Sequence, residues 1–434
     1  MPDRIAADTV VRQMPFASLL RLPLKQHAGA AAVAVVRAGE EVLRGQLLAR
    51  AEDDTAVPLH APATGRIVRF SEQSDGAGGT AGVIELAPLP GDTQEQPRGR
   101  TFDPDRNSAD ELLAAVRDAG IIGLGGERGP THLRLLRARE RGVSVLVING
   151  IEGEPGFTRV PALLARHGSD VISGARFLGK VLGSQDAVLA VEKPDAAAAS
   201  AMLAESENHN RPALAVLPPR YPQGAAELLL RTLSGRPVEG IPAFTAERAV
   251  VFSLATVAEV GRLLTHGLTL TDQLMTLAGN GLREVGNYRV PLGTPVGFAL
   301  AQAGAHSELD RVLAGGPMRG HALGHLDRPI TKGATGFVAM AASESAPSPE
   351  AMACIRCGEC VAACPLQLHP AELGLLARRG EIQAMVDDWQ LERCFECGCC
   401  AYVCPSHIPL VQKFRAAKKQ SRRAEALAAR EEPA

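Results

Sequence analysis

CIRCGECVAACP (residues 354–365) and CFECGCCAYVCP (residues 394–405) each contain the spacing C-x2-C-x2-C-x3-C-P. In bacterial ferredoxins, the first three thiolates of such a run bind one [4Fe–4S] cluster, and the fourth reaches the other cluster. The sequence therefore predicts two clusters with crossed ligands. The first would be held by Cys354, Cys357, Cys360 and Cys404, and the second by Cys394, Cys397, Cys400 and Cys364.

The placement of the cysteines indicates metal rather than disulfides. All nine cysteines of the 434-residue chain lie between Cys354 and Cys404. A secreted disulfide protein would spread them through its domains, so we expect a reducing compartment. Structural zinc is the alternative, but zinc sites usually have separated C-x2-C pairs. Cys399 is left over, and we expect it to pack beside a cluster.

Composition excludes several classes of protein. The formal net charge is −2, so no global basic charge points to nucleic acid. The sequence has no apolar run of about 18 residues or more, which predicts no membrane-spanning helix. The amino terminus shows no signal-peptide pattern. If the protein works at a membrane, we expect another chain to hold it there.

Outward from the cysteine runs, the chain is predicted to be multidomain, with α/β and α+β parts. Short β segments punctuated by glycines over residues 1–90 indicate a barrel-sandwich of the biotinyl or lipoyl type. The turn around Ala61 to Thr64 has no lysine, so we expect this domain to be unmodified. Strands alternating with helices over 108–244 predict a parallel α/β domain. The remaining parts are a small α+β module with β-grasp character at 245–340, a helical cysteine domain at 345–415 and a charged tail at 416–434.

Three turn-rich segments of the α/β domain are candidate ligand loops. GIIGLGGERGPT (120–131) could let its backbone approach a phosphate, although such a stretch is more often a plain loop. NGIEGEPG (149–156) and YPQG (221–224) each follow a predicted strand. Ligands bind beyond the carboxyl ends of parallel strands, so the loops are expected to meet at one pocket. Glu152 and Glu154 could there orient a ribose, a flavin ring or a nicotinamide amide.

Taken together, the sequence resembles the C subunit of the Rnf electron-transport complex. The likeness runs along nearly the whole chain. It is carried by PLKQHAGAAAVAVVRAGEEVLRGQLLA (23–49), HAPATG (60–65), GLGG (123–126), GPT (129–131), INGIEGEP (148–155), YPQG (221–224), AGGPMRG (314–320) and CFECGCCAYVCPSHIPLVQKFRAAK (394–418).

The resemblance implies a fold and a function. The middle domain would be similar to the flavin-binding subunit of respiratory complex I, and residues 245–340 would be a soluble-ligand-binding β-grasp module. FMN, an NAD(H) site and two [4Fe–4S] clusters would connect NAD(H), ferredoxin and other subunits of an ion-translocating complex. The chain would sit peripherally on the cytoplasmic face of the inner membrane as part of an NAD(H):ferredoxin oxidoreductase.

The resemblance also implies site residues. Glu152 and Glu154 would be catalytic. FMN and NAD(H) would be bound by Gly123, Gly125, Gly126, Thr131, Arg134, Asn149, Glu152, Tyr221 and Gly224.

The chain departs from the family pattern at several of these loops. The family's loop reads GGAGFPT. In this chain, Glu127, Arg128 and Gly129 stand in place of its small–Gly–Phe part, and Arg134 stands where the family has a lysine. The acidic residues expected near Arg159 are missing. Two alternatives follow: a soluble flavin/iron–sulfur reductase similar to the cobalamin reductase of propanediol microcompartments, which the domain order disfavours, or a non-catalytic electron-wire and scaffold subunit with a decayed flavin site.

Overall fold

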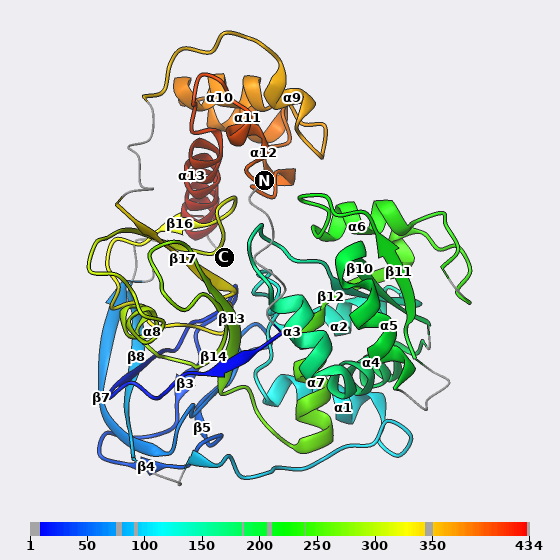
Figure 1. Cartoon of the computed structure of the whole chain (residues 1–434), viewed down its shortest axis with the longest axis vertical. Helices are drawn as coiled ribbons and strands as arrows, with labels where there is room; N and C mark the ends of the chain where they lie inside the picture. Colours follow the sequence, from blue (N-terminus) through cyan, green and yellow to red (C-terminus); the bar gives the residue numbers. More distant parts are fainter. Residues whose placement is uncertain are drawn as a thin grey trace. The chain divides into compact units, whose positions relative to one another are not determined.

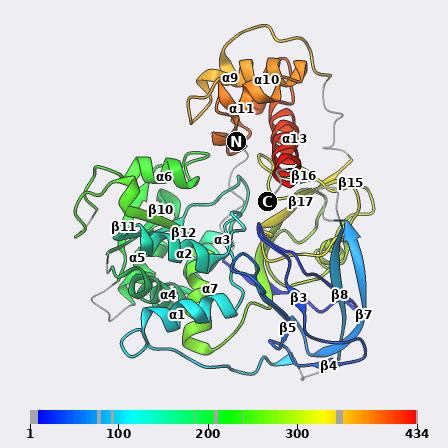
Figure 2. The ribbon, with the colours of Figure 1, turned by 180° about the vertical axis from the view of Figure 1, so that it is seen from behind.

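The computed structural model describes residues 9–74, 80–90, 94–184, 186–205, 211–238, 240–342 and 350–431 (Figures 1 and 2). The chain divides into two compact units, which we call the large unit (1–315 and 322–344) and the cysteine unit (316–321 and 345–434). Three predicted domain limits, residues 1, 345 and 434, lie outside the described residues.

The predicted barrel-sandwich is confirmed near the amino terminus. Its two antiparallel sheets have the orders β2-β8-β7-β4 and β3-β5-β6. Aliphatic side chains from both sheets, such as Leu22, Leu48 and Ile84, form one buried core. The strands are β2 (Leu20–Pro23), β3 (Val33–Ala34), β4 (Glu41–Val42), β5 (Leu47–Arg50), β6 (Leu59–His60), β7 (Gly65–Ser74) and β8 (Thr80–Pro88).

The α/β domain has a parallel four-stranded sheet of order β11-β10-β9-β12. Its strands are β9 (Val145–Gly150), β10 (Asp186–Glu192), β11 (Ala213–Leu217) and β12 (Ala249–Ser253). Its helices are α1 (Ala109–Asp118), α2 (Thr131–Glu140), α3 (Arg159–Arg166), α4 (Gly168–Leu182), α5 (Ala196–Ala204), α6 (Ala226–Leu233) and α7 (Leu254–His266), with short 3-10 turns at Lys193–Asp195 and Ala246–Arg248.

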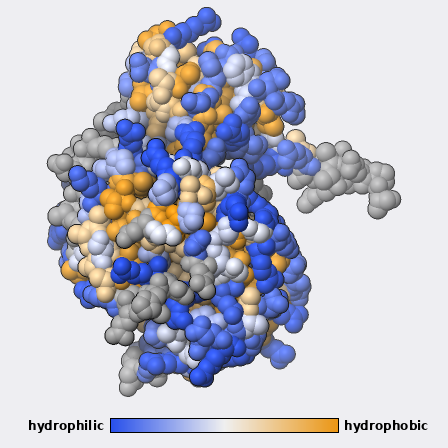
Figure 3. Space-filling view, turned by 90° about the vertical axis from the view of Figure 1, so that its right-hand side faces the viewer, coloured by the Kyte–Doolittle hydropathy of each residue, from blue (hydrophilic) through white to orange (hydrophobic). Residues whose placement is uncertain are grey.

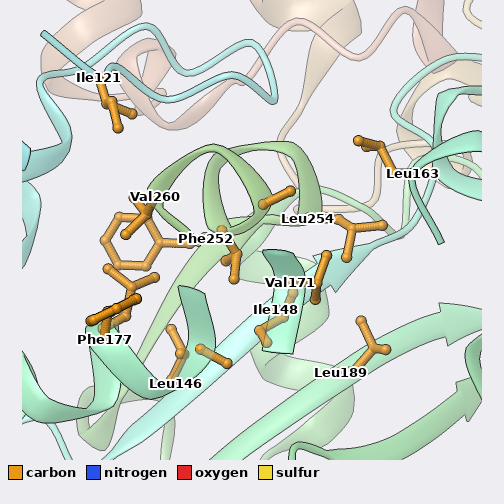
Figure 4. Close-up of a cluster of buried hydrophobic side chains, with 14 of the residues drawn as sticks. Ile121, Leu146, Ile148, Leu163, Val171, Phe177, Leu189, Phe252, Leu254 and Val260 are labelled. Carbon is orange, nitrogen blue, oxygen red and sulfur yellow. The ribbon is translucent and has the colours of Figure 1, made fainter. Parts of the chain in front are cut away.

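Both faces of this sheet are buried, as the continuous apolar strands predict. Leu146 and Ile148 of β9 belong to the core that includes α4 and α7, as Figure 4 shows. Val147, on the opposite face of β9, shares a second core with Leu229 of α6. Helices α4 and α7 approach closely, because a Cβ on Gly174 would lie 2.0 Å from the carbonyl oxygen of Val257. The carboxyl ends of the strands are thus held by packing on both sides.

The predicted domain boundary at residue 245 is wrong. Strand β12 pairs in parallel with β9, and α7 packs on α4, so residues 249–266 belong to the α/β domain. A short apolar strand such as AVVFS suits the parallel sheet of the α/β domain and the sheet of the α+β module equally well. Only its pairing shows to which sheet it belongs.

A six-stranded mixed sheet of order β1-β14-β13-β17-β15-β16 forms the α+β module. Helix α8 (Val296–Gln302) shares its core, which includes Met275, Val290 and Phe337. The strands are β1 (Val11–Gln13), β13 (Asp272–Ala278), β14 (Gly286–Pro291), β15 (Leu309–Ala314), β16 (His321–Ala322) and β17 (Gly336–Ala341). Strand β1 pairs with β14, so residues 11–13 lie in this sheet rather than in the predicted barrel-sandwich.

Buried ionisable groups join the three modules of the large unit. Lys332 is 2% exposed, and its Nζ donates to the carbonyl oxygens of Pro58 (2.6 Å) and Gly120 (2.8 Å). Burial lowers the pKa of Lys332 to about 7. Asp272 is 3% exposed and pairs with Arg44 (2.8 Å) and Arg289. Although burial opposes ionisation of Asp272, the charges of the nearby arginines hold its pKa well below its usual range.

The cysteine unit is helical. Its core contains Leu373, Leu376, Met385 and Phe414. The elements are α9 (Glu359–Ala362), α10 (Pro370–Arg379), α11 (Ile382–Asp387), a 3-10 turn (Leu391–Arg393), α12 (Cys399–Tyr402) and α13 (Leu410–Glu431).

The predicted limit between the cysteine domain and its tail is wrong. Helix α13 continues without a break from Leu410 to Glu431, past the predicted limit at residue 415. Ala417 and Lys418 are buried, and Lys418 Nζ donates to the carbonyl oxygen of Cys394. This part of the charged segment is therefore integral to the cysteine unit.

Candidate functional site

Eight cysteines line two cavities in the cysteine unit. Cys354, Cys357, Cys360 and Cys404 line a cavity of about 300 Å³. Cys364, Cys394, Cys397 and Cys400 line a second, narrower cavity of about 20 Å³. This grouping coincides with the crossed sets predicted from the spacing; cluster ligation itself stays a prediction. Cys399 is not among the described residues that line either cavity.

The chemistry of the thiols fits iron–sulfur clusters. Burial and the charges of Cys394, Cys397 and Cys364 raise the pKa of the Cys400 thiol to about 12. Four thiolates are stable in so small a space only around a positive group, and [4Fe–4S] iron is such a group. Among the described residues, no three His, Cys, Asp or Glu side chains lie close enough to hold a single metal ion.

The glycine stretch of the large unit forms a tight loop between two cores. Gly123 N donates to Gly129 O (2.9 Å), and Ile122 and Leu124 are buried in the barrel-sandwich core. Gly126 has a φ of +108°, a conformation that favours glycine. The loop packs on the amino end of α7, because a Cβ on Gly125 would lie 2.7 Å from Ser253 Cβ.

Asn149 joins two of the predicted ligand loops. It lies near the end of β9, where its Nδ2 donates to the carbonyl oxygen of Gly224 (2.8 Å). Its Oδ1 accepts from the backbone N–H of Ile151 (3.1 Å). The Tyr221–Pro222 peptide bond in the neighbouring turn is cis. Asn149 therefore fixes the YPQG turn against the loop after β9.

Glu152 and Arg159 connect the glycine stretch to the loop after β9. Glu152 Oε2 accepts from the backbone N–H of Val160 (3.1 Å), and Glu152 Oε1 lies 3.7 Å from Arg159 Nε. Their side chains are 6% and 8% exposed. Arg159 Nη1 also donates to the carbonyl oxygen of Leu124 in the glycine stretch (3.3 Å). All three predicted loops are thus connected at the carboxyl ends of parallel strands.

Open backbone and buried polar atoms make this junction suitable for a flavin phosphate or ring. No described atom lies within 4 Å of the Cβ positions of Gly126, Gly129 or Gly153, so a ligand can approach the backbone there. Thr131 Oγ1 and Gln223 Nε2 are buried and have no hydrogen-bond partner among the described residues. Both groups flank the connected loops and can serve a bound ligand.

Two of the departures from the family pattern have definite positions. Glu127 Oε2 lies over the glycine loop, 3.0 Å and 3.1 Å from where a Cβ on Gly123 and Gly125 would be. Arg134 lies with its guanidinium carbon 5.1 Å from the centre of the Phe252 ring, in a cation–π contact.

Other residues of the site could not be recognised from the sequence. Arg159 reads in the sequence as the loss of an acidic residue, whereas in the structure it is a buried partner of Glu152. Gln223 gave no signal beyond its place in the YPQG turn, and Lys332 gave none. Glu154 is 7% exposed, and its catalytic role stays a prediction.

The chain matches three domain families. Residues 3–86 match the RnfC barrel sandwich hybrid domain, residues 116–262 the Nuo51 FMN-binding domain, and residues 353–408 the 4Fe–4S dicluster domain. The second match includes β12 and most of α7, in agreement with their place in the α/β sheet. The cofactors of the chain are therefore FMN and [4Fe–4S] clusters, and the chain passes electrons between them.

The comparisons also identify relatives along the whole chain. The C subunit of the ion-translocating oxidoreductase complex of Rhodobacter capsulatus is 33% identical over 95% of this chain and 80% of its own length. The C subunit of the proton-translocating ferredoxin:NAD(+) oxidoreductase complex of Clostridium ljungdahlii is 30% identical over 89% of this chain and 85% of its own. A solved NAD+-reducing [NiFe]-hydrogenase in the H2-reduced state aligns with 75% of this chain and 68% of its own, at 19% identity and a TM-score of 0.49.

The described helices include none with the length and apolarity needed to cross a bilayer. The barrel-sandwich match and these relatives agree with each other. The chain therefore belongs to the family of C subunits of ion-translocating (Rnf) oxidoreductase complexes.

Proposed function

We propose that this chain is the NAD(H)-reactive subunit of a complex that couples ferredoxin and NAD+ redox chemistry to ion movement. The observation that carries the proposal is the junction of three loops at the carboxyl ends of parallel strands. Asn149 connects the loop after β9 to the YPQG turn, and the Glu152–Arg159 pair connects the loop after β9 to the glycine stretch. In this proposal the chain is held peripherally at the cytoplasmic face of the inner membrane by other subunits.

The residues of the junction would divide the work. Bound FMN supplies the exchange between electron pairs and single electrons. The backbone of the 123–129 loop would approach the flavin, and the Thr131 hydroxyl and Gln223 amide would orient it or the nicotinamide. Asn149, Glu152 and Arg159 would hold the loops in place, because each makes a hydrogen bond to a protein group. Arg159 Nε is buried and has no hydrogen-bond partner among the described residues.

The thiols would then carry electrons onward. We propose the ligand sets Cys354, Cys357, Cys360, Cys404 and Cys394, Cys397, Cys400, Cys364, as their two cavities support. Crossed ligation keeps two clusters close together, which favours single-electron transfer between them. From there, electrons would pass to or from another subunit.

Anaerobic purification followed by a visible spectrum, an iron assay and NADH-dependent dye reduction tests the proposal. We expect flavin bands, about eight irons for two [4Fe–4S] clusters, and dye reduction. Iron without flavin would refute the NAD(H) role and leave the clusters in place.

A second candidate is an electron-wire subunit without a working flavin site. The Glu127 carboxylate over Gly123 and Gly125 favours it, since a negative group opposes a phosphate. The Glu127→Ala variant distinguishes the two. If the wild-type protein has no flavin and the variant binds it, the second candidate is correct. If the wild-type protein binds flavin and reduces dye, it is refuted.

A further inference from the structure

The two cysteine-lined cavities differ in their access to solvent. Cys357 of the first set is exposed, whereas Cys397 and Cys400 of the second set are buried. The wall of the second cavity is largely aliphatic, with Leu368, Leu373 and other apolar side chains. An electron that leaves or enters through the surface of this unit has the shorter path through the first set.

The rim of the first cavity combines apolar and basic side chains. Met352 and Ile355 line this cavity and are 60% and 68% exposed. Arg356 and Arg378 are exposed lining residues, and Lys413 is a half-buried one. We call these five residues the cluster rim. Apolar surface is visible among hydrophilic residues on the cysteine unit, at the top of Figure 3.

The charge of the cluster rim has one sign. No Asp or Glu is among the described residues that line the first cavity; Glu359 follows a lining residue in sequence but is not itself one. The second cavity is different, because its Glu396 is paired with Arg415 (2.8 Å) and Lys418 (3.7 Å). Arg356 and Arg378 are exposed to solvent, where they can meet a partner's charges.

This combination suits transient docking of a protein. Opposite charges around a contact steer two proteins together and set their orientation. Exposed large apolar side chains among those charges exclude water when the partner arrives. The basic residues of the cluster rim select an acidic surface. Its exposed apolar side chains select a protein rather than a small anion.

We infer that the cluster rim is the docking surface for an acidic one-electron carrier protein, and that electrons enter or leave the chain through the first cluster. The inference rests on the proposed cluster assignment. One electron moves per encounter: the first cluster is oxidised by one electron as the partner's centre is reduced by one, or the reverse, and no bond forms or breaks.

The test uses the full-length holoprotein and an acidic [2Fe–2S] ferredoxin as the probe. The second-order electron-transfer rate is measured by stopped flow, and the dissociation constant by calorimetry, at low and high salt. We expect the rate to fall and the dissociation constant to rise steeply with salt. Arg378→Glu should lower the rate and raise the dissociation constant, each at least about tenfold, as loss of a rim charge predicts. Arg378→Gln, which removes the charge without reversing it, should have an intermediate effect.

Arg379→Glu is the matched control, because Arg379 is the next residue of α10, is 61% exposed and does not line the cavity. It should leave the rate and the affinity nearly unchanged. Equal effects of the two charge reversals, or a rate that does not depend on salt, would overturn the inference. A basic cytochrome c that binds more tightly than the ferredoxin would overturn it as well.

Iron content and the EPR spectrum separate this inference from the proposed function. A wild-type protein without two reducible clusters contradicts the proposed function. Two normal clusters in every variant, together with unchanged ferredoxin binding in Arg378→Glu, contradict only the docking surface.

Discussion

The cysteine unit and the loop junction of the large unit use their polar side chains in opposite ways. In the cysteine unit, eight thiols line two cavities, and their positions are explained by a cofactor. At the loop junction, Asn149, Glu152 and Arg159 bind other protein groups. The difference teaches that the proposed cluster sites would be made of ligand side chains, whereas the proposed flavin site would be made of loop backbone that side chains hold in shape.

The largest expected effect concerns the crossed cysteine sets. Cys364→Ala should abolish the cluster that the run 394–400 otherwise holds, because Cys364 lines the cavity of that run. About half of the iron should be lost, since each of two clusters has four irons. Iron assay and EPR measure the loss.

Cys399→Ala is the matched control and should keep both clusters, because Cys399 lines neither cavity. If Cys364→Ala removes the EPR signal of the other cluster, held by Cys354, Cys357 and Cys360, the crossed assignment is wrong.

The second expected effect is a pH dependence confined to the large unit. The pKa of Lys332 is lowered from 10.5 to about 7 in the folded protein. Between those values the unfolded chain binds a proton that the folded protein has released, so the free energy of unfolding rises with pH. The slope is about 1.4 kcal/mol per pH unit, or about 2 to 3 kcal/mol between pH 7 and 9. His60 does not contribute there, because burial and the Lys332 charge lower its pKa to about 3.

Urea unfolding at several pH values tests this dependence. Far-UV circular dichroism follows both units, whereas fluorescence of Trp389, the chain's one tryptophan, follows the cysteine unit alone. The rise of the unfolding free energy with pH should appear in the circular dichroism transition of the large unit. It should disappear in Lys332→Met. A slope that survives the substitution would assign it to other groups.

The third expected effect is a joint loss of stability and of flavin when the Glu152–Arg159 pair is broken. Glu152→Ala leaves Arg159 buried without its partner, which should cost about 3 kcal/mol of unfolding free energy and lower the flavin content. Glu152→Gln should recover part of both, since its amide oxygen can still accept from Val160 N. Flavin loss with unchanged urea stability would show that Glu152 contacts the flavin directly instead.

The smallest effect is expected at Arg134. Its described contact is the cation–π interaction with Phe252, so Arg134→Ala should cost about 1 kcal/mol or less. Flavin affinity, measured by fluorescence titration of reconstituted protein, should change less than about fivefold, since about 1 kcal/mol corresponds to that factor. A loss of flavin binding above tenfold would place Arg134 on the phosphate.

The cysteine sets were predictable because their chemistry is written in local spacing. Three thiols, each separated from the next by two residues, reach one cluster from a single loop, and this does not depend on the rest of the fold. The parallel α/β sheet was predictable for a similar reason, since strands such as VLVING begin with a continuous apolar run, here residues 145–148.

The remaining features depend on contacts between distant residues. Strand β12 could not be assigned until its pairing with β9 was known, because AVVFS suits any buried strand. Arg159 looked like a lost acid, since its partner Glu152 lies across a loop. A buried lysine such as Lys332 has no sequence signal at all, because its acceptors, Pro58 and Gly120, are backbone carbonyls far away in the chain.

The position of Cys404 on the wall of the first cavity sets an order of events during synthesis. When the ribosome has added Cys400, all four thiols of the second set exist, but the first set still has only Cys354, Cys357 and Cys360. With the proposed ligand sets, the ligands of the second cluster are therefore complete before those of the first. The wall of the second cavity also includes Val411 and Phe414, so a chain that stops between Cys400 and Cys404 would have the four thiols of the second set without the residues that enclose them.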